Sequence, residues 1–190
     1  MFMHSNNWLQ YSYQKGFTLI ETIVGIVVLA ISFSVLTSLV FPVAEQSAEQ
    51  LHQIKAAELA QSLLNEIQNK AFDENSDMAG GRVRCGESGA INCSTAMGAE
   101  GSETRVTFND VDDYNNLIYN AGEIENSQGQ LLSLYTGYSL SIRVCNDADY
   151  NGPDCNGAAD ANTSTAKLII VTVTTPTDFT MRFSTYKANF

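Results

Sequence analysis

The sequence predicts an α+β protein in which one long N-terminal helix packs on an antiparallel β-sheet. Residues 22–44 form an uncharged apolar run, and residues 56–71 place their apolar side chains on one helical face. The last third of the chain alternates apolar and polar residues with the period of β-strands. With 190 residues, the chain has room for one globular domain and little more.

The apolar run at residues 22–44 has the length of a membrane span. A helix of this length reaches about 34 Å, enough to cross the hydrocarbon core of a bilayer. Lys15 precedes the run and Glu45 and Glu49 follow it, which favours a cytoplasmic N-terminus and an exported C-terminal part. A secretory signal peptide has a shorter apolar region and a small-residue cleavage site, neither of which is evident here. A plain signal anchor is the simplest alternative.

One carboxylate stands where the apolar run begins. Glu21 closes the segment Lys15-Gly16-Phe17-Thr18-Leu19-Ile20-Glu21, among otherwise apolar residues. A carboxylate at the centre of a bilayer costs roughly 2.5–3.5 kcal/mol, and less near the interface, so such a residue indicates a function. Because the run contains no cation, we expect the partner of Glu21 to come from another molecule or from a new chain end.

This segment, followed by an apolar helix, resembles the N-terminal signature of the type IV pilin superfamily, which includes pilins, minor pilins and type II secretion pseudopilins. The resemblance implies a type IV pilin fold. It also implies that a prepilin peptidase cuts between Gly16 and Phe17 and that Phe17 is then N-methylated. Glu21 would become the fifth residue of the mature chain. Its carboxylate would there pair with the terminal amine of a neighbouring subunit in a filament.

The resemblance extends further along the chain. Residues 17–72 and the acidic segment 108–114 are most similar to minor pilins of the mannose-sensitive haemagglutinin (MSHA) pilus. This implies a non-enzymatic subunit whose partners are other pilin subunits, the prepilin peptidase/methyltransferase and the inner-membrane pilus assembly machinery. Before assembly the protein would be a single-pass inner-membrane protein with a periplasmic head, and after assembly it would lie in a pilus at the cell surface.

We therefore expect four segments along the chain. They are a prepilin leader at 1–16, a transmembrane and filament-core helix at 17–44, an amphipathic half of the same helix at 45–72, and a β-sheet head with disulfide loops at 73–190.

The second half of the predicted helix is amphipathic. On a helical wheel the apolar residues of 56–71 share one face, and polar residues occupy the other. In the first half, mostly small residues recur every four positions, a spacing that favours close packing with another helix. These residues are Thr22, Ile26, Ala30, Ser34 and Ser38. Ordinary transmembrane composition would also produce such a stripe.

After residue 72 the composition changes to a long loop followed by strands. Residues 73–101 are rich in Gly, Asp and Asn, which predicts irregular structure. Strands are predicted at 104–108, 138–144, 167–174 and 179–184. The last two flank Thr175-Pro176-Thr177-Asp178, which predicts a hairpin. We expect the apolar face of this sheet to pack on the apolar helix face.

Four cysteines lie in the predicted head: Cys85, Cys93, Cys145 and Cys155. None of their spacings is C-x-x-C, which disfavours a zinc ribbon or a thioredoxin motif. Disulfides persist in exported domains. Three pairings are possible, and we favour Cys85 with Cys93 and Cys145 with Cys155, because each would close a Gly-rich or Asn-rich loop.

The segment inside the second cysteine pair resembles the first half of a calcium loop, with oxygen ligands at alternate positions and a turning glycine. The candidate calcium ligands are Asp147, Asp149, Asn151 and Asp154. The twelfth position of the pattern is Ala158 where a glutamate is required, although Asp154 or Asp160 could substitute. Solvated turn residues beside a disulfide are the simpler interpretation.

Asp110, Asp112 and Asp113 form a second acidic group. They could bind calcium themselves or complete the first site.

Composition disfavours several functions. The net charge of -11 would repel a nucleic-acid backbone. His4 and His52 are the two histidines, too few for a multi-histidine metal site, and no nucleophile with a nearby base can be named. We therefore predict no enzyme and no cofactor other than a possible calcium ion. The alternatives are a type II secretion pseudopilin and a membrane-anchored, calcium-dependent adhesive module that never polymerises.

Overall fold

The computed structural model describes residues 16–77, 84–152, 155 and 160–190, without the side chains of 42–45. Apart from Gly16, the predicted leader lies outside these residues. The chain divides into two compact units, Met1–Ser47 and Ala48–Phe190, and the long helix contributes residues to both.

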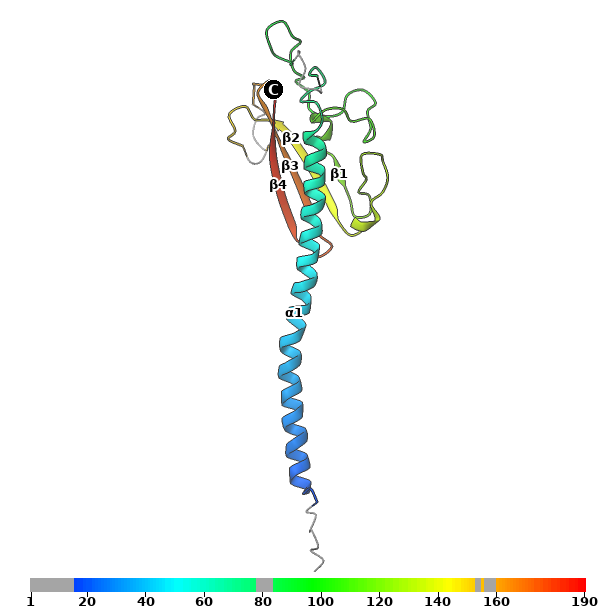
Figure 1. The fold of residues 1–190 in the computed structure, drawn as a ribbon, viewed down its shortest axis with the longest axis vertical. Coiled ribbons are helices and arrows are strands. Elements are labelled where there is room, and N and C mark those ends of the chain that lie inside the picture. Colours follow the sequence, from blue (N-terminus) through cyan, green and yellow to red (C-terminus); the bar gives the residue numbers. More distant parts are fainter. Residues whose placement is uncertain (1–15, 78–83, 153–154, 156–159) are drawn as a thin grey trace, which may run out of the picture. The chain divides into compact units, whose positions relative to one another are not determined.

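The helix α1 spans Leu19–Gln68, so the predicted long N-terminal helix is confirmed (Figure 1). It ends four residues before the predicted position 72. The N–H of Lys70 donates to the carbonyl of Ile67 at 3.0 Å, which tightens the last turn. The backbone of Ala71 then exchanges hydrogen bonds with Asn109 and Val111 instead of continuing the helix.

Four antiparallel strands form one sheet in the order β1-β2-β3-β4. They are β1 (Ile118–Tyr119), β2 (Ser139–Asn146), β3 (Ala166–Thr174) and β4 (Thr180–Ala188). The predicted hairpin is confirmed, since Thr174 pairs with Thr180 and the N–H of Asp178 donates to the carbonyl of Thr175 at 3.0 Å. The short β1 was not predicted.

The predicted strand at 104–108 is wrong, because these residues form a turn. The hydroxyl of Thr107 accepts the N–H of Thr104 at 2.8 Å and donates to its carbonyl at 3.1 Å. The N–H of Thr107 also donates to that carbonyl, at 2.8 Å. Threonine side chains that bond the neighbouring backbone in this way compete with strand pairing. The described part of 73–101 contains no helix or strand, as predicted.

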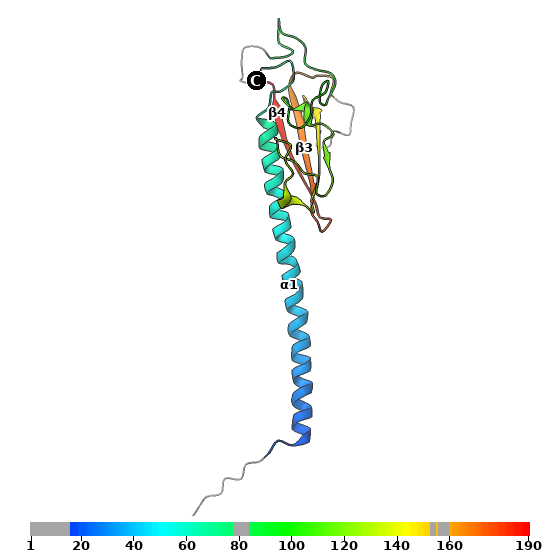
Figure 2. The ribbon, with the colours of Figure 1, turned by 90° about the vertical axis from the view of Figure 1, so that its right-hand side faces the viewer.

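Within the second unit, the C-terminal part of α1 forms one layer and the sheet forms the other (Figure 2). One continuous core lies between them. Its members include Leu59, Leu63 and Ile67 from α1, Leu140 and Ile142 from β2, and Val171 and Val173 from β3. The alternating burial of β2 confirms that its period-2 pattern faces this core. The molecule is therefore α+β, an arrangement consistent with the type IV pilin fold.

Candidate functional site

The start of α1 is an exposed segment with a capped helix end. Gly16 and Phe17 precede the helix, and Phe17 is 82% exposed. The hydroxyl of Thr18 accepts the N–H of Glu21 at 3.3 Å. Thr18 therefore caps the helix, a role that the sequence analysis missed although Thr-x-x-Glu is the capping-box pattern. Glu21 lies in the first turn, where the helix dipole favours a negative charge.

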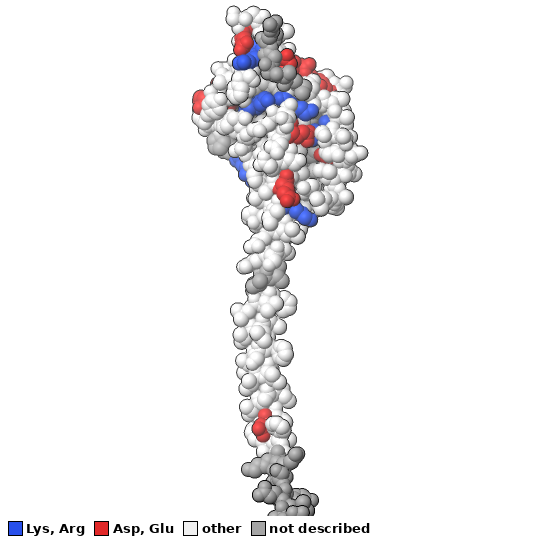
Figure 3. Space-filling model, in the orientation of Figure 1, with Lys and Arg blue, Asp and Glu red and all other residues white. Residues whose placement is uncertain are grey.

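The first part of α1 exposes its apolar side chains on all sides. Every large apolar side chain between Leu19 and Phe41 is at least half exposed, and Ile23 is the lowest at 50%. Figure 3 shows this surface as white, apart from one acidic patch near its beginning. By length and composition, α1 is able to cross a membrane. A continuous apolar surface of this extent marks contact with a membrane or another protein.

Most hydroxyl groups in this part of α1 are bonded to the helix itself. Thr22 donates to the carbonyl of Leu19 at 2.8 Å, and Ser32 donates to that of Val28 at 2.7 Å. Thr37 and Ser38 bond the preceding turn in the same way. These side chains therefore bring no unsatisfied hydroxyl donor into an apolar environment. The members of the small-residue stripe are exposed, and close packing on them stays a prediction.

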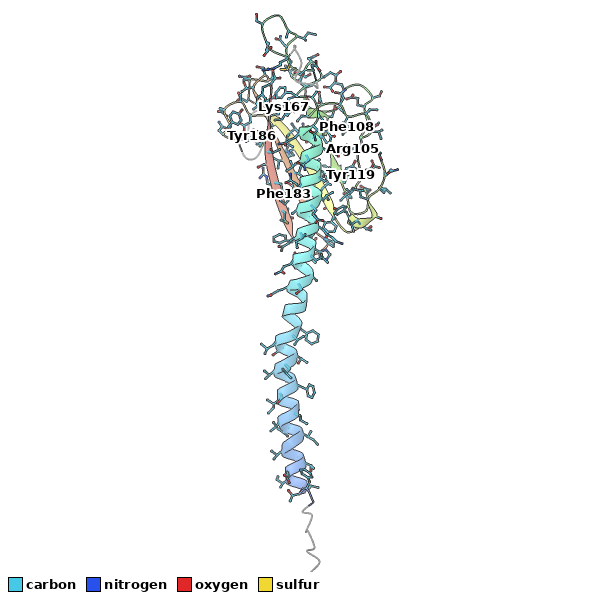
Figure 4. All side chains as sticks on the ribbon, viewed as in Figure 1. Arg105, Phe108, Tyr119, Lys167, Phe183 and Tyr186 are labelled. Carbon is cyan, nitrogen blue, oxygen red and sulfur yellow. A yellow bond between two sulfur atoms is a disulfide. The ribbon has the colours of Figure 1, made fainter. Side chains whose placement is uncertain are left out.

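In the head, a polar junction joins α1 to the loops beside β1. Arg105 forms a bidentate pair with Glu66, at 2.6 and 2.8 Å, and the Tyr114 hydroxyl donates to the same carboxylate at 2.8 Å. Burial alone would raise the pKa of Glu66, but the bonds from Arg105 and Tyr114 outweigh it and lower that pKa. In Figure 4, Arg105 lies on the β1 side of α1 and Tyr186 lies on the β4 side.

A fully buried cation lies at the start of β3. Lys167 has no exposed surface, and its ammonium contacts Asp112 at 2.7 Å and Asp73 at 3.3 Å, both of which are also fully buried. The ring of Phe72 lies 4.7 Å from the same nitrogen. The sequence analysis missed this group; the available signal was a single lysine opening an otherwise apolar strand. Lys167 joins the end of α1 to the sheet.

Two disulfides close loops of the head. The structure joins Cys85 to Cys93 and Cys145 to Cys155, which are the two local pairings that the sequence favoured.

The candidate calcium loop forms a hydrogen-bonded turn. The carboxylates of Asp147, Asp149 and Asp160 lie within 4.8 Å of one another, whereas Asp154 lies outside the described residues. Asp147 accepts the N–H groups of Asn151 and Gly152 and the hydroxyl of Tyr186. The hydrogen bond to Asp147, together with burial, raises the pKa of Tyr186 to about 12. These three hydrogen bonds leave the Asp147 carboxylate with further acceptor capacity, so calcium binding by this loop stays a prediction.

The second acidic group takes a different form. The structure places Asp110 and Asp113 beside Glu74, Glu100 and Glu103. Burial, together with the nearby Asp112 and Asp113, raises the pKa of Glu100 to about 7 and that of Asp110 to about 9. The pKa of Glu103 is raised as well, by burial and by Asp113. The group therefore holds more carboxylates than its surroundings stabilise as anions.

A comparison with known protein families identifies the region at the start of α1. Residues 11–37 match a family model described as the prokaryotic N-terminal methylation motif. No curated protein and no solved structure matches the chain. The motif is type IV pilin-like and indicates a type IV pilin-like or pseudopilin protein, that is, a structural subunit. It implies processing by prepilin peptidase, assembly with other pilins and membrane anchoring before assembly.

Proposed function

We propose that the protein is a minor pilin, a non-enzymatic subunit that assembles into a type IV pilus or into the complex that initiates it. One observation carries the proposal. A methylation motif at residues 11–37 opens a helix whose apolar side chains have no partner in the described chain, whereas the head has its own core. Such a helix requires another apolar environment.

Processing would create a positively charged partner for the carboxylate of Glu21. Cleavage between Gly16 and Phe17 leaves a methylated amine on Phe17, and this group remains positive at neutral pH. Phe17 is followed directly by the capped helix start, so the new amine stays close to the first turn. The mature chain therefore carries a positive and a negative group at the same end of one apolar helix.

These two groups favour pairing between subunits. A carboxylate or an amine alone in an apolar filament core is strongly penalised, and the penalty falls when the two form a pair. Neighbouring helices would pair Glu21 of one subunit with the Phe17 amine of the next. The pair would thus select the axial register in which helices assemble.

The sequence resemblance supports one kind of filament, an MSHA-like pilus. Residues 17–72 and 108–114 resemble MSHA minor pilins, and we propose an MSHA-like pilus on that ground. A type II secretion pseudopilin would share the motif and the helix. The location of the assembled protein separates the two, because a pilus projects from the cell surface and a pseudopilus spans the periplasm.

Mass spectrometry of the N-terminal peptide tests the processing step. Filaments sheared from intact cells and the membrane fraction of the same cells are compared. We expect sheared filaments to contain a peptide that begins at N-methylated Phe17. A chain found only in membranes and still carrying residues before Phe17 would show that the protein is an anchored module, and the proposal would be wrong.

The substitution Glu21→Ala tests assembly. Loss of a buried charge partner costs about 3–5 kcal/mol, so incorporation into filaments should fall by at least about tenfold, while the head stays folded. The matched control is Glu58→Ala, which removes an exposed carboxylate from the head part of the same helix. Equal incorporation of the Glu21→Ala chain and the parent chain would contradict the proposed pairing.

A further inference from the structure

Five acidic residues of the head converge from two separate segments. Glu74, Glu100 and Glu103 belong to the long loop after α1, and Asp110 and Asp113 lie at the 3₁₀ helix η1 (Asp112–Tyr114). We refer to these five residues as the acidic cluster. One oxygen each of Glu74, Glu100 and Asp110 lie within 4.8 Å of one another, and so do one oxygen each of Glu100, Glu103 and Asp113. Glu100 therefore connects both sets.

The backbone fixes one oxygen of each buried aspartate. Oδ1 of Asp110 accepts the N–H groups of Asp112 and Asp113, at 2.9 and 3.2 Å. Oδ2 of Asp113 accepts those of Asn109 and Asp110, at 2.7 and 3.0 Å. These bonds hold the two carboxylates in place and leave the other oxygen of each available.

The available oxygens are buried and have no donor. Asp110 is fully buried and Asp113 is 2% exposed, yet Oδ2 of Asp110 and Oδ1 of Asp113 have no hydrogen-bond partner in the described part of the chain. The same holds for Oε2 of Glu100 and for Oδ2 of the adjacent Asp112. Buried acceptors in native proteins are satisfied as a rule, and an unsatisfied one costs about 1–3 kcal/mol, more when it is charged. Several such oxygens in one place favour the binding of a cation.

Lys167, the cation that contacts Asp112 beside the acidic cluster, is already engaged. Lys167 donates to Asp112 and Asp73, both fully buried, so its single positive charge is shared between two carboxylates. None of the ion pairs among the described residues involves a carboxylate of the acidic cluster. A divalent ion supplies two positive charges and accepts several carboxylate oxygens at once.

We propose that the acidic cluster binds one calcium ion, with Glu74, Glu100 and Asp110 as its principal ligands. All donors are carboxylate oxygens, the type that calcium prefers, and neither histidine nor a free thiol contributes. At calcium–oxygen distances of about 2.3–2.6 Å, ligands on opposite sides of the ion lie about 4.6–5.2 Å apart. Separations of up to 4.8 Å therefore fit within one calcium coordination sphere.

The ion would hold the long loop against the segment that pairs with the chain just after α1. Glu100 and Glu103 come from the loop, whereas Asp110 and Asp113 belong to the segment whose backbone pairs with Ala71 just after α1. Calcium binding would thus hold the loop against the end of the helix. This inference is independent of filament assembly.

Calorimetric titration of the purified full-length protein tests the site. The protein is held in detergent micelles, freed of metal with a chelator, and titrated with Ca²⁺ and separately with Mg²⁺. We expect about one equivalent of Ca²⁺ to bind, with at least about tenfold weaker binding of Mg²⁺, and the melting temperature of the head to rise with Ca²⁺. No binding of Ca²⁺, or equal binding of the two ions, would overturn the proposal.

Three variants locate the ion. Asp110→Asn keeps Oδ1 for the backbone bonds and removes the charge, and Glu100→Gln changes a residue that is only partly buried, so it decides the question if Asp110→Asn fails to fold. Each should weaken Ca²⁺ binding at least about tenfold. The matched control, Asp149→Asn in the hydrogen-bonded loop, should leave binding unchanged. Loss of binding in Asp149→Asn with retention in Glu100→Gln would place the ion elsewhere and overturn the proposal.

Discussion

The two parts of α1 differ in how their apolar side chains are covered. Between Leu19 and Phe41 the helix is apolar on every side, and each large apolar side chain is at least half exposed. Between residues 56 and 67 the apolar side chains occupy one face and form a core with the sheet. The first part therefore depends on other molecules for a partner, whereas the second is stabilised by the chain's own head.

This difference separates two kinds of mutational effect. Substitutions in the head part should change the free energy of unfolding, and substitutions in the apolar part should change association with membranes or other subunits. Variants that alter one property without the other test whether the separation holds.

The largest effect on the head is expected from Lys167→Ala. This substitution leaves Asp73 and Asp112 fully buried without their cation, which should lower the free energy of unfolding by about 3–5 kcal/mol. Urea denaturation of the full-length protein in detergent, followed by near-ultraviolet circular dichroism, measures it. Arg84→Ala, which removes an exposed pair with Glu87, should change stability by less than about 1 kcal/mol. A loss in Lys167→Ala no larger than this would mean that the buried triad contributes little.

A matched pair of isoleucines in α1 tests the comparison directly. Ile67 is fully buried and Ile26 is 67% exposed. Ile67→Ala should lower the free energy of unfolding of the head by about 2–5 kcal/mol, because it opens a cavity in the core, and Ile26→Ala should change it by less than about 0.5 kcal/mol. The same denaturation experiment measures both. Similar losses in the two variants would show that the apolar part of α1 contributes to the stability of the head.

A smaller effect is expected from acidification. The pKa of Glu66 is lowered in the folded protein, because the bonds from Arg105 and Tyr114 outweigh the effect of burial. A lowered pKa contributes stability that is fully present above the unfolded value, 4.5, and is lost as the pH falls through the folded value. Unfolding measured from pH 6 downward should therefore be less pH-dependent in Glu66→Gln than in the parent chain. Glu21→Gln, in the apolar part, should keep the parent profile of the head.

Periodic patterns predicted most of the fold. The apolar run and the amphipathic face located α1, and alternation located β2 and β4 to within a few residues. At 104–108 the same reasoning failed, because the side chain of Thr107 satisfies the backbone locally. The two-residue β1 is too short to show a period.

The polar sites of the head were less predictable because their members are far apart in sequence. Arg105 meets Glu66 across 39 residues, and Lys167 meets Asp73 across 94. The spacing of residues within a short segment cannot predict contacts of this kind. The calcium-like spacing at residues 147–152 pointed to a loop whose Asp147 carboxylate accepts three hydrogen bonds. Several buried carboxylate oxygens without a donor lie in the acidic cluster, where loop geometry decides which oxygen has a donor.

The back-bonded hydroxyls of α1 have a consequence for movement between environments. Thr22, Ser32, Thr37 and Ser38 each have a partner within their own helix. When such a helix leaves lipid for a protein interior, none of these bonds has to be broken, and no new acceptor has to be found. For these four hydroxyl groups, a change from one apolar surrounding to another therefore requires no exchange of hydrogen bonds.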